Sequence, residues 1–541
     1  MPPRAALVVL VTFAAAALLT ACGSPPQVLD ISPQRGAVDV RSGEMIRVRF
    51  DRPMNHASVT QHFHLEPGVQ GALRWNGNSE MVFEHVPFNA SSQYRVVLEP
   101  GYRDAHGTTN PLRHSWTFRT EAPPSLASSS PAPGDRDVDP AAYITLTFSR
   151  EVDPGSLASA IGLSPSAPFA IHQDPADARR VILAPQSLLE PRTGYSVTVS
   201  RDARDVDGNR LGAGAAVSFT TGAFRPLRHW ISFIAAPSPE SGGTGVWIVN
   251  ENKVARRLID GPVSAFSWSA DSSRLLLRSP AGTWTDQPLD GTPAVLAFQA
   301  EWADFLAPGR GYAFLDHGQL QLMRPDGGVI QVATGVTEAT VAPGGGRLAF
   351  ATREPSGSGA TTEIDGYDTE LRTRYRLQVE PEPVDGLAWS PDGQSLAYRL
   401  DTSETTRRQV RVRSLRDGTA VTVVTGEVSA PVWQADRQHV FFTAVVQGPG
   451  GPVTRAFRSS VSPSSTPGTL SASSGMPAGQ DVRVGSLSPS PDGHQVAFAP
   501  DGDGRAGVWE MNADGTGLTQ LTDPDPGRFP YSVMGVTWTP G

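Results

Sequence analysis

The sequence predicts an all-β protein with two small β-sandwiches followed by a β-propeller of seven blades. A unit of about 95 residues occurs twice between residues 28 and 221. From about residue 226 onward, a turn followed by an apolar strand recurs every 35 to 56 residues, roughly, which is the period of a four-stranded propeller blade. In both repeats the strands alternate apolar and polar residues. At 541 residues the chain is too long for one compact core.

The duplicated unit is visible in matched turn and strand residues. Matching pairs, each 98 positions apart, are Ser32 and Ser130, Pro33 and Pro131, Gly36 and Gly134, Asp39 and Asp137, and Phe50 and Phe148. Beyond a three-residue insertion, Tyr94 matches Tyr195 and Phe118 matches Phe219. Short alternating strands without a helix pattern, joined by Asp and Gly turns, favour a sandwich in each copy.

The two copies resemble the bacterial Ig-like domains of the S-layer-associated type. That family carries a Phe-x-x-x-Met/Val-Asp element, which is present here at residues 50–55 and 148–153. It also closes with a Tyr-x-Val strand, an Asp-x-x-Gly-Asn turn and a Phe-x-Thr strand. The second copy keeps Asp205, Gly208 and Asn209, whereas the first has Thr108 in place of the asparagine. The resemblance implies Ig-like domains at residues 28–121 and 122–222.

The C-terminal repeat is a turn that follows an aromatic or apolar residue and precedes a strongly apolar strand. The clearest copies are Trp389-Ser390-Pro391-Asp392-Gly393 and Ser490-Pro491-Asp492-Gly493. Related turns begin at Trp268, Leu306, Val341 and Trp433. A further copy is split, because the turn at Trp538 ends the sequence and the strand that should follow it matches residues 230–234. The C-terminal strand is therefore expected to complete the first blade and remove exposed sheet edges.

These repeats resemble the β-propeller repeats of the TolB type (WD40-like), best in residues 490–522. The resemblance implies a propeller over residues 226–541. It has seven blades, or six if the weak repeat near Leu306 or Val341 is not a blade. In the TolB family the propeller is a platform for protein interaction in the envelope. No individual binding residue is carried over, because the matching positions are turn and core residues.

The N-terminus resembles a bacterial lipoprotein signal peptide over residues 1–21. Arg4 precedes an apolar run from Ala6 to Ala21, which is too short for a comfortable membrane span. The run ends Leu19-Thr20-Ala21-Cys22, a lipobox in which the cysteine thiol is the lipidated group. Cys22 is the only cysteine in the chain, so no disulfide framework accounts for it. Residues 22–27 then form a lipidated linker, and acyl chains such as palmitate anchor the protein to a membrane.

The sequence contains no recognisable catalytic, cofactor-binding or metal-binding motif, so the protein is expected not to be an enzyme. There is no Gly-x-Ser-x-Gly, His-Glu-x-x-His, Cys-x-x-Cys or Gly-Lys-Ser/Thr pattern. His62 and His64 alternate on a predicted strand, where a surface or structural role is favoured over metal ligation. The carboxylates of Asp205 and Asp207 have a spacing compatible with calcium binding. Turns also favour Asp, Gly and Asn for backbone reasons, so the sequence does not decide whether these residues bind calcium.

The remaining candidate residues are assigned to turns and core. Asp392 and Asp492 are predicted to satisfy nearby backbone amides in their turns. The tryptophans of the turn repeat are predicted to be mainly core residues; they are Trp268, Trp389, Trp433 and Trp538. The Ser-, Pro- and Gly-rich residues 448–475 are predicted to form a surface loop or an extended hairpin.

Three functional hypotheses follow. A net charge of −9 with no basic stripe argues against nucleic acid as a partner. The leading hypothesis is an extracytoplasmic lipoprotein of the cell envelope, surface-exposed or periplasmic, with a sandwich stalk and a propeller that binds protein or glycan. The second is a hydrolase or lyase that uses the propeller channel. The third is a structural spacer of the cell wall without a discrete ligand.

Overall fold

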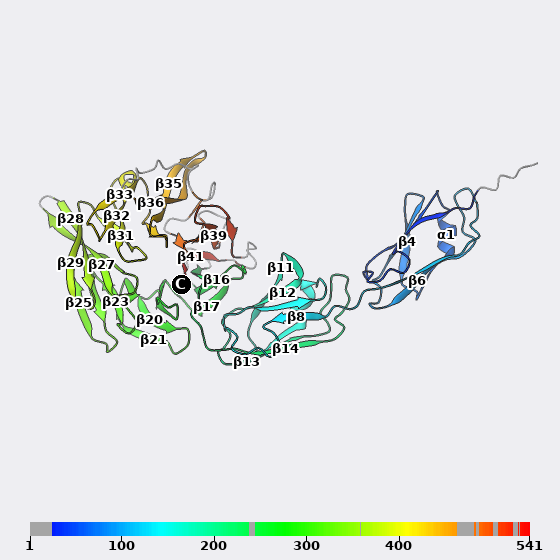
Figure 1. The fold of residues 1–541 in the computed structure, drawn as a ribbon, viewed down its shortest axis with the longest axis horizontal. Coiled ribbons are helices and arrows are strands. Elements are labelled where there is room, and N and C mark those ends of the chain that lie inside the picture. The colour runs from blue at the N-terminus through cyan, green and yellow to red at the C-terminus, as the bar shows by residue number, and fades with distance from the viewer. Residues whose placement is uncertain are drawn as a thin grey trace, which may run out of the picture.

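A computed structural model of the chain places three β-rich domains one after another (Figure 1). The structure describes residues 24–236, 244–356, 359–462, 476, 481–482, 486–500, 507–522, 529 and 531–540. Two sandwiches precede a ring of sheets that begins at residue 231 and ends at residue 538. The all-β architecture predicted from the two repeats is confirmed.

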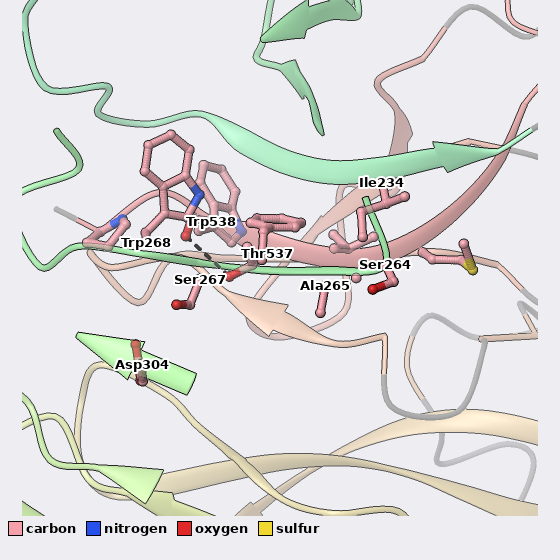
Figure 2. A pocket seen from close by; sticks show the side chains of 13 residues that line it. Ile234, Ser264, Ala265, Ser267, Trp268, Asp304, Thr537 and Trp538 are labelled. Atoms are coloured by element: carbon pink, nitrogen blue, oxygen red, sulfur yellow. Dashed lines mark hydrogen bonds between the residues drawn. The ribbon is translucent and has the colours of Figure 1, made fainter. Parts of the chain in front are cut away.

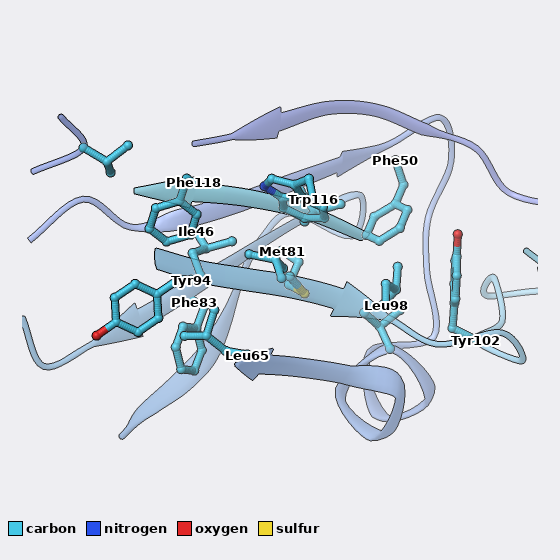
Figure 3. Close-up of a cluster of buried hydrophobic side chains, with 14 of the residues drawn as sticks. Ile46, Phe50, Leu65, Met81, Phe83, Tyr94, Leu98, Tyr102, Trp116 and Phe118 are labelled. Carbon is cyan, nitrogen blue, oxygen red and sulfur yellow. The ribbon is translucent and has the colours of Figure 1, made fainter. Parts of the chain in front are cut away.

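The first domain is a sandwich of a four-stranded and a three-stranded antiparallel sheet. The four-stranded sheet has the order β1 (Val28–Ser32), β2 (Ile46–Phe50), β5 (Glu80–His85) and β4 (Gly71–Asn76). The other has the order β3 (Phe63–Glu66), β6 (Gln93–Leu98) and β7 (His114–Arg119). Inward-facing side chains from both sheets, including Ile46, Met81, Tyr94 and Trp116, form one core (Figure 3). Alternating burial along β2 is the period-2 pattern that its sequence predicts.

The second domain repeats this topology strand for strand. Its four-stranded sheet has the order β8 (Leu126–Ser130), β9 (Ile144–Phe148), β12 (Asp177–Pro185) and β11 (Phe169–Asp174). Its three-stranded sheet has the order β10 (Ile161–Ser164), β13 (Gly194–Val199) and β14 (Ala215–Thr220). Equivalent details recur as well: the hydroxyls of Tyr94 and Tyr195 accept a backbone N–H bond from Asn89 and Glu190, respectively, each at 3.0 Å.

Each sandwich also contains a short helix that the strand pattern did not predict. Helix α1 (His56–His62) follows Asn55, whose side chain accepts the Ser58 backbone N–H at 3.0 Å. Helix α2 (Pro154–Ala160) follows Asp153, which caps it in the same way. Seven residues are too few to show helical periodicity, but an Asn or Asp cap is a helix-start signal. The prediction that His62 lies on a strand with His64 is therefore wrong, because His62 ends α1 and His64 lies in β3.

The described residues beyond 230 form seven sheets, which we call blades 1 to 7. The strands of each blade are given from the one nearest the central channel outward. Blade 1 has β41 (Ser532–Trp538), β15 (Ile231–Ala236), β16 (Gly245–Val249) and β17 (Arg256–Asp260); blade 2 has β18 (Ala265–Trp268), β19 (Arg274–Arg278), β20 (Thr283–Pro288) and β21 (Ala294–Gln299); blade 3 has β22 (Trp302–Phe305), β23 (Tyr312–Asp316), β24 (Gln319–Met323) and β25 (Val329–Ala333); and blade 4 has β26 (Val336–Val341), β27 (Arg347–Ser356), β28 (Gly359–Asp368) and β29 (Thr373–Glu380). Blade 5 has β30 (Val384–Trp389), β31 (Ser395–Leu400), β32 (Gln409–Ser414) and β33 (Ala420–Thr425); blade 6 has β34 (Val432–Trp433), β35 (His439–Gly448) and β36 (Gly451–Ser460); and blade 7 has β37 (Ser488–Pro489), β38 (Gln495–Phe498), β39 (Trp509–Asn512) and β40 (Thr519–Gln520). A 3₁₀ turn, η1 (Thr405–Arg407), lies between β31 and β32.

The ring is closed by backbone pairing between the two ends of the propeller. Strand β41 pairs antiparallel with β15 and becomes the inner strand of blade 1. The Trp538 backbone N–H also donates to Ser488 Oγ of blade 7 at 3.0 Å. Closure of this kind pairs the inner edge of β15, which would otherwise be exposed, and this is the arrangement that the split repeat predicts.

The turns between the first and second strands of the blades lie together on one face of the ring. Three contacts between neighbouring blades show this: the Ser272 hydroxyl donates to the Pro540 carbonyl at 2.7 Å, the Ala307 N–H to the Gly345 carbonyl at 3.2 Å, and the Gln434 amide to the Gly493 carbonyl at 2.8 Å. Because connections between successive antiparallel strands alternate between the two ends of a sheet, the turns between third and fourth strands share this face.

The opposite face carries the connections between second and third strands. In blades 4 and 6 these connections end two long hairpins, β27–β28 and β35–β36, in which each strand has ten residues. In blade 5 the same connection contains η1. The part of residues 448–475 that the structure describes thus belongs mainly to a hairpin strand, β36, and residues 463–475 lie outside the described residues.

We call the pairing of β41 with β15 the closing seam. Substitution of a buried residue at this seam is expected to destabilise the propeller far more than substitution of an exposed residue on an outer strand. Ile231 is fully buried against blade 7 and pairs with Trp538, whereas Val295 on the outer strand β21 is 72% exposed. Ile231→Ala should lower the free energy of unfolding by about 2–5 kcal/mol, and Val295→Ala by less than about 0.5 kcal/mol. Urea denaturation followed by tryptophan fluorescence measures both values, and equal effects would contradict a ring held at this seam.

Candidate functional site

The structure brings the candidate residues of the second sandwich to its junction with the first. Asp205 Oδ1 accepts the backbone N–H groups of Asp207 and Asn209 at 3.1 and 2.8 Å, and its Oδ2 accepts the Asn209 amide at 2.9 Å. Asp104 accepts equivalent N–H bonds from His106 and Thr108 in the first domain. The two carboxylates thus organise homologous turns, which is the turn interpretation of the sequence.

Asp207 and Asn209 project from this turn onto the first sandwich. Both carboxylate oxygens of Asp207 accept from the Arg41 guanidinium, at 2.9 and 3.2 Å. Asn209 Oδ1 accepts the Ser42 hydroxyl at 2.9 Å. A guanidinium paired with Asp207 repels a divalent cation, so the contacts favour a joint between the two domains over a calcium site.

A buried carboxylate completes this joint. Glu121, at the end of the first sandwich, is 2% exposed and accepts the Ser42 backbone N–H at 3.3 Å. Arg150 of the second sandwich donates to its other oxygen. Burial raises the pKa of Glu121, and the nearby Asp207 and Asp205 carboxylates add to the shift, while Arg150 and the Ser42 N–H oppose it. We refer to Arg41, Ser42, Glu121, Arg150, Asp207 and Asn209 as the first joint.

The second joint connects the second sandwich to blade 1 through a buried arginine. Arg256 is 1% exposed, and its guanidinium lies 4.4 Å from the ring centroid of Tyr143 and 5.0 Å from that of Trp230. Tyr143 belongs to the sandwich and Trp230 to the propeller, so the cation joins aromatic rings from both domains. Arg256 also donates to the Ala141 carbonyl, and the Tyr143 hydroxyl donates to the Val254 carbonyl at 2.9 Å.

The second joint defines which face of the propeller meets the sandwich. Val254 and Arg256 lie where the connection between β16 and β17 meets β17, on the face that carries the first-to-second-strand turns. Arg192 of the sandwich also pairs with Asp290, beyond β20 on the same face, at 3.8 Å. We call this the stalk face. The face with the tips of β27–β28 and β35–β36 and with η1 is the far face.

Most buried carboxylates of the propeller pair with arginine and tie neighbouring strands or blades together. Glu380 of blade 4 is 1% exposed and accepts from Tyr398 and Arg411 of blade 5. Asp286 of blade 2 accepts from Arg274 of its own blade and from the Tyr312 hydroxyl of blade 3. These charges are compensated inside the fold and have a structural role.

Glu338 has no such cation within ion-pair distance among the described residues. It lies on the inner strand β26, and its Oε1 accepts the Leu387 backbone N–H of blade 5 at 3.0 Å, while Oε2 is buried without a partner in this part of the structure. The neighbouring strand kinks at Gly386, whose φ is +64°. A Cβ at this position would lie 2.2 Å from the Ala430 Cβ, which leaves room only for glycine. Burial raises the pKa of Glu338 to about 7.

The predicted turn and core roles agree with the local contacts. Asp392 Oδ1 accepts from the Ser390 hydroxyl and the Gln394 N–H, and Asp492 makes the equivalent contacts with Ser490 and His494. Trp268, Trp389 and Trp538 are buried, and Trp433 is half-buried. Cys22, the predicted lipidation site, lies outside the described residues.

One group of metal-type ligands occurs among the described residues, on blade 3. Ligand atoms of Glu301, Asp316 and His317 lie within 4.8 Å of one another. They already bond among themselves: the His317 N–H donates to both Glu301 oxygens, and His317 Nδ1 lies 2.6 Å from Asp316 Oδ1. Strand pairing between β22 and β23 creates this group, so residue spacing alone provided no signal for it.

Sequence reasoning also missed Arg256 and Glu338, and it missed Asp304 on the inner strand β22. A signal was present for Asp304, because it is the one charged residue in the apolar run Trp302-Ala303-Asp304-Phe305-Leu306. For Arg256 no local signal existed, since its partners Tyr143 and Trp230 come from distant parts of the chain. No helix in the described part of the chain has the length and apolar character needed to cross a bilayer.

Comparisons with known proteins assign the two sandwiches and give neighbours for the propeller. Residues 23–120 and 121–221 each match the family model of the bacterial Ig-like domain, so both segments are bacterial Ig-like domains. No curated protein matches the chain.

Similar solved structures include two TolB proteins and a lyase, all at low identity. TolB of Acinetobacter baumannii is 14% identical over 65% of this chain and 81% of that chain, with a TM-score of 0.37. The putative TolB of Agrobacterium tumefaciens is 18% identical over 55% and 89%, with a TM-score of 0.33. Oligogalacturonate lyase of Vibrio parahaemolyticus is 11% identical over 54% and 84%, with a TM-score of 0.38. The propeller assignment itself rests on the strand pairing described above.

Loss of the Arg41–Asp207 pair is expected to loosen the first joint without unfolding either sandwich. Asp207→Ala removes both bonds to Arg41, and the exposed arginine can then return to water. The expected cost to stability is about 1 kcal/mol or less, but small-angle X-ray scattering should show a broader range of shapes. Asp177→Ala is the matched control, because Asp177 pairs with Arg179 inside its own domain. Identical scattering from both variants would contradict the proposed joint.

The raised pKa of Glu338 predicts a stability difference that depends on pH. The folded protein favours the protonated Glu338 carboxyl. The contribution of this group to folding stability is therefore complete below its pKa in the unfolded chain, about 4.5, and is lost as the pH rises through about 7. The free energy of unfolding of Glu338→Gln minus that of the wild type should therefore be about 1–3 kcal/mol larger at pH 8 than at pH 4.5. Chemical denaturation at both pH values tests this, with the exposed Glu354→Gln as control. A pH-independent difference would rule out the ionisation of Glu338 as the cause.

Proposed function

We propose that this protein is a non-catalytic binding scaffold outside the cytoplasm, anchored to a membrane by a lipid on Cys22. Its two Ig-like domains serve as a stalk, and the far face of the propeller meets a protein or glycan partner. The observation that carries the proposal is the pair of fixed joints, because they direct one particular face of the propeller away from the stalk.

The geometry of the second joint supports this assignment of faces. The aromatic cage around Arg256 and the Tyr143–Val254 hydrogen bond occupy the stalk face at blade 1. A partner of comparable size to the sandwich would collide with it there. The far face has no contact with the Ig-like domains among the bonds of the described residues, and long hairpins from blades 4 and 6 extend it.

The character of the far face fits recognition of a macromolecule. Arg353 and Glu354 near one hairpin tip and Gln447 near the other are exposed, and Glu404 pairs with Arg407 on the intervening loop at 2.8 Å. A surface with both charge signs and hydrogen-bonding groups suits a polar, specific interface rather than a general electrostatic one. A catalytic function has no comparable support, because the recurring turn aspartates are occupied in their own turns.

Site-specific photo-crosslinking in native cells tests the proposed face. A photoreactive phenylalanine analogue at Glu354 or Gln447 should give a discrete crosslinked species for a protein partner, or high-mass polymeric material for a glycan. The same analogue at Glu370, on the stalk-face turn between β28 and β29, is the matched control because that side chain is also exposed. Crosslinks from Glu370 with none from the hairpin tips would refute the assignment of the far face.

A further inference from the structure

A cavity lies in the propeller channel between the inner strands of blades 1, 2 and 3. It measures about 490 Å³ and is lined mainly by β41 and β18, with Asp304 of β22 on one side (Figure 2). This volume is within the range of sites that hold small organic molecules. None of its lining residues belongs to either joint or to the far-face hairpins.

Apolar and aromatic side chains share the walls of the cavity with the hydroxyl groups of Ser264, Ser267 and Thr537. Phe266, Met534 and Val536 contribute apolar surface, and Trp268 and Trp538 lie side by side at one end (Figure 2). Trp268 is fixed in place, because its Nε1–H donates to Ser232 Oγ at 2.8 Å. Trp538 Nε1 is buried and finds no acceptor in the described part of the chain. The cavity thus places polar groups beside apolar and aromatic side chains.

Asp304 is the one carboxylate among the residues that line this cavity. Its Oδ1 accepts the Phe305 backbone N–H at 2.8 Å. Among the described residues no Arg, Lys or His nitrogen lies within ion-pair distance of it, unlike Asp286, Asp365 and Glu380, which each pair with an arginine. Burial raises the pKa of Asp304 to about 6, although hydrogen bonds from the Phe305 N–H and the Ser267 hydroxyl act to lower it.

We propose that this cavity binds a small molecule with a positively charged nitrogen on an apolar body, with Asp304 as its counter-ion. A carboxylate without a cationic partner beside apolar surface complements an organic ammonium group, whose charge pairs with Asp304 while its apolar body contacts side chains such as Phe266 and Met534. A metal ion would require more oxygen ligands than one carboxylate supplies. A sugar is disfavoured because Trp268 and Trp538 are only 8% exposed, so neither offers an open face for stacking.

This proposal does not depend on the binding role of the far face. A ligand inside the channel contacts both β41 of blade 1 and β18 of blade 2, so it links two neighbouring blades beside the strand that closes the ring. By mass action, any such ligand stabilises the folded ring.

Calorimetric titration of the mature full-length protein with choline chloride tests the proposal. Its neutral isostere 3,3-dimethylbutan-1-ol has the same shape without the charge. We expect choline to bind in a 1:1 ratio and at least tenfold more tightly than the isostere, and Asp304→Asn to weaken choline at least tenfold. Glu338→Gln is the matched control, since Glu338 also lies on an inner strand but does not line the cavity, and it should leave choline affinity unchanged.

Several outcomes would overturn the proposal. Equal affinity for the neutral isostere would show that the charge is not recognised. Unchanged choline affinity in Asp304→Asn, with a wild-type melting temperature, would place the site elsewhere. No binding of choline at millimolar concentrations, or binding of glucose or galactose that depends on Asp304, would also reject an ammonium site.

Discussion

Pairing between β41 and β15 is the interaction on which the arrangement of the molecule depends. It brings the last strand of the chain into the same blade as the first strand of the propeller, with Ile231 opposite Trp538 and Ala236 opposite Ser532. Without it, blade 1 would expose the inner edge of β15. Because both ends of the propeller meet in blade 1, the chain enters the ring at one point, and the second Ig-like domain docks beside that point on the stalk face.

The two joints then convert this topology into a fixed orientation. Each contains one charged group withdrawn from water: Glu121, which accepts from Arg150, in the first joint, and Arg256 between Tyr143 and Trp230 in the second. Such groups add little net stability, because desolvation offsets most of their attraction. What they provide is directional contact, since a guanidinium and its partners are satisfied in only a narrow range of geometries. The stalk and the propeller are therefore expected to move as one body.

Most of the fold was predictable because it is repeated. The duplicated strands around Phe50 and Phe148 predicted two similar sandwiches, and the split turn at Trp538 predicted the pairing of the two propeller ends. The short helix at His56–His62 was not predicted, because about two turns leave no periodic pattern and only Asn55 marks its start. The two joints and the Asp304 cavity were not predicted from the sequence, for a different reason. Each is assembled from residues far apart in sequence, and a single sequence contains no information on which of them meet.

The central claim, that the second joint holds the propeller in one orientation relative to its neighbouring Ig-like domain, can be tested by double electron–electron resonance between that domain and the far face. In a Cys22→Ser background, spin labels on Arg136→Cys and Gln447→Cys, both at exposed positions, report that distance directly. The account predicts a single narrow distance distribution that broadens when Arg256 is replaced by alanine. A broad or multimodal distribution in the protein that keeps Arg256 would contradict it.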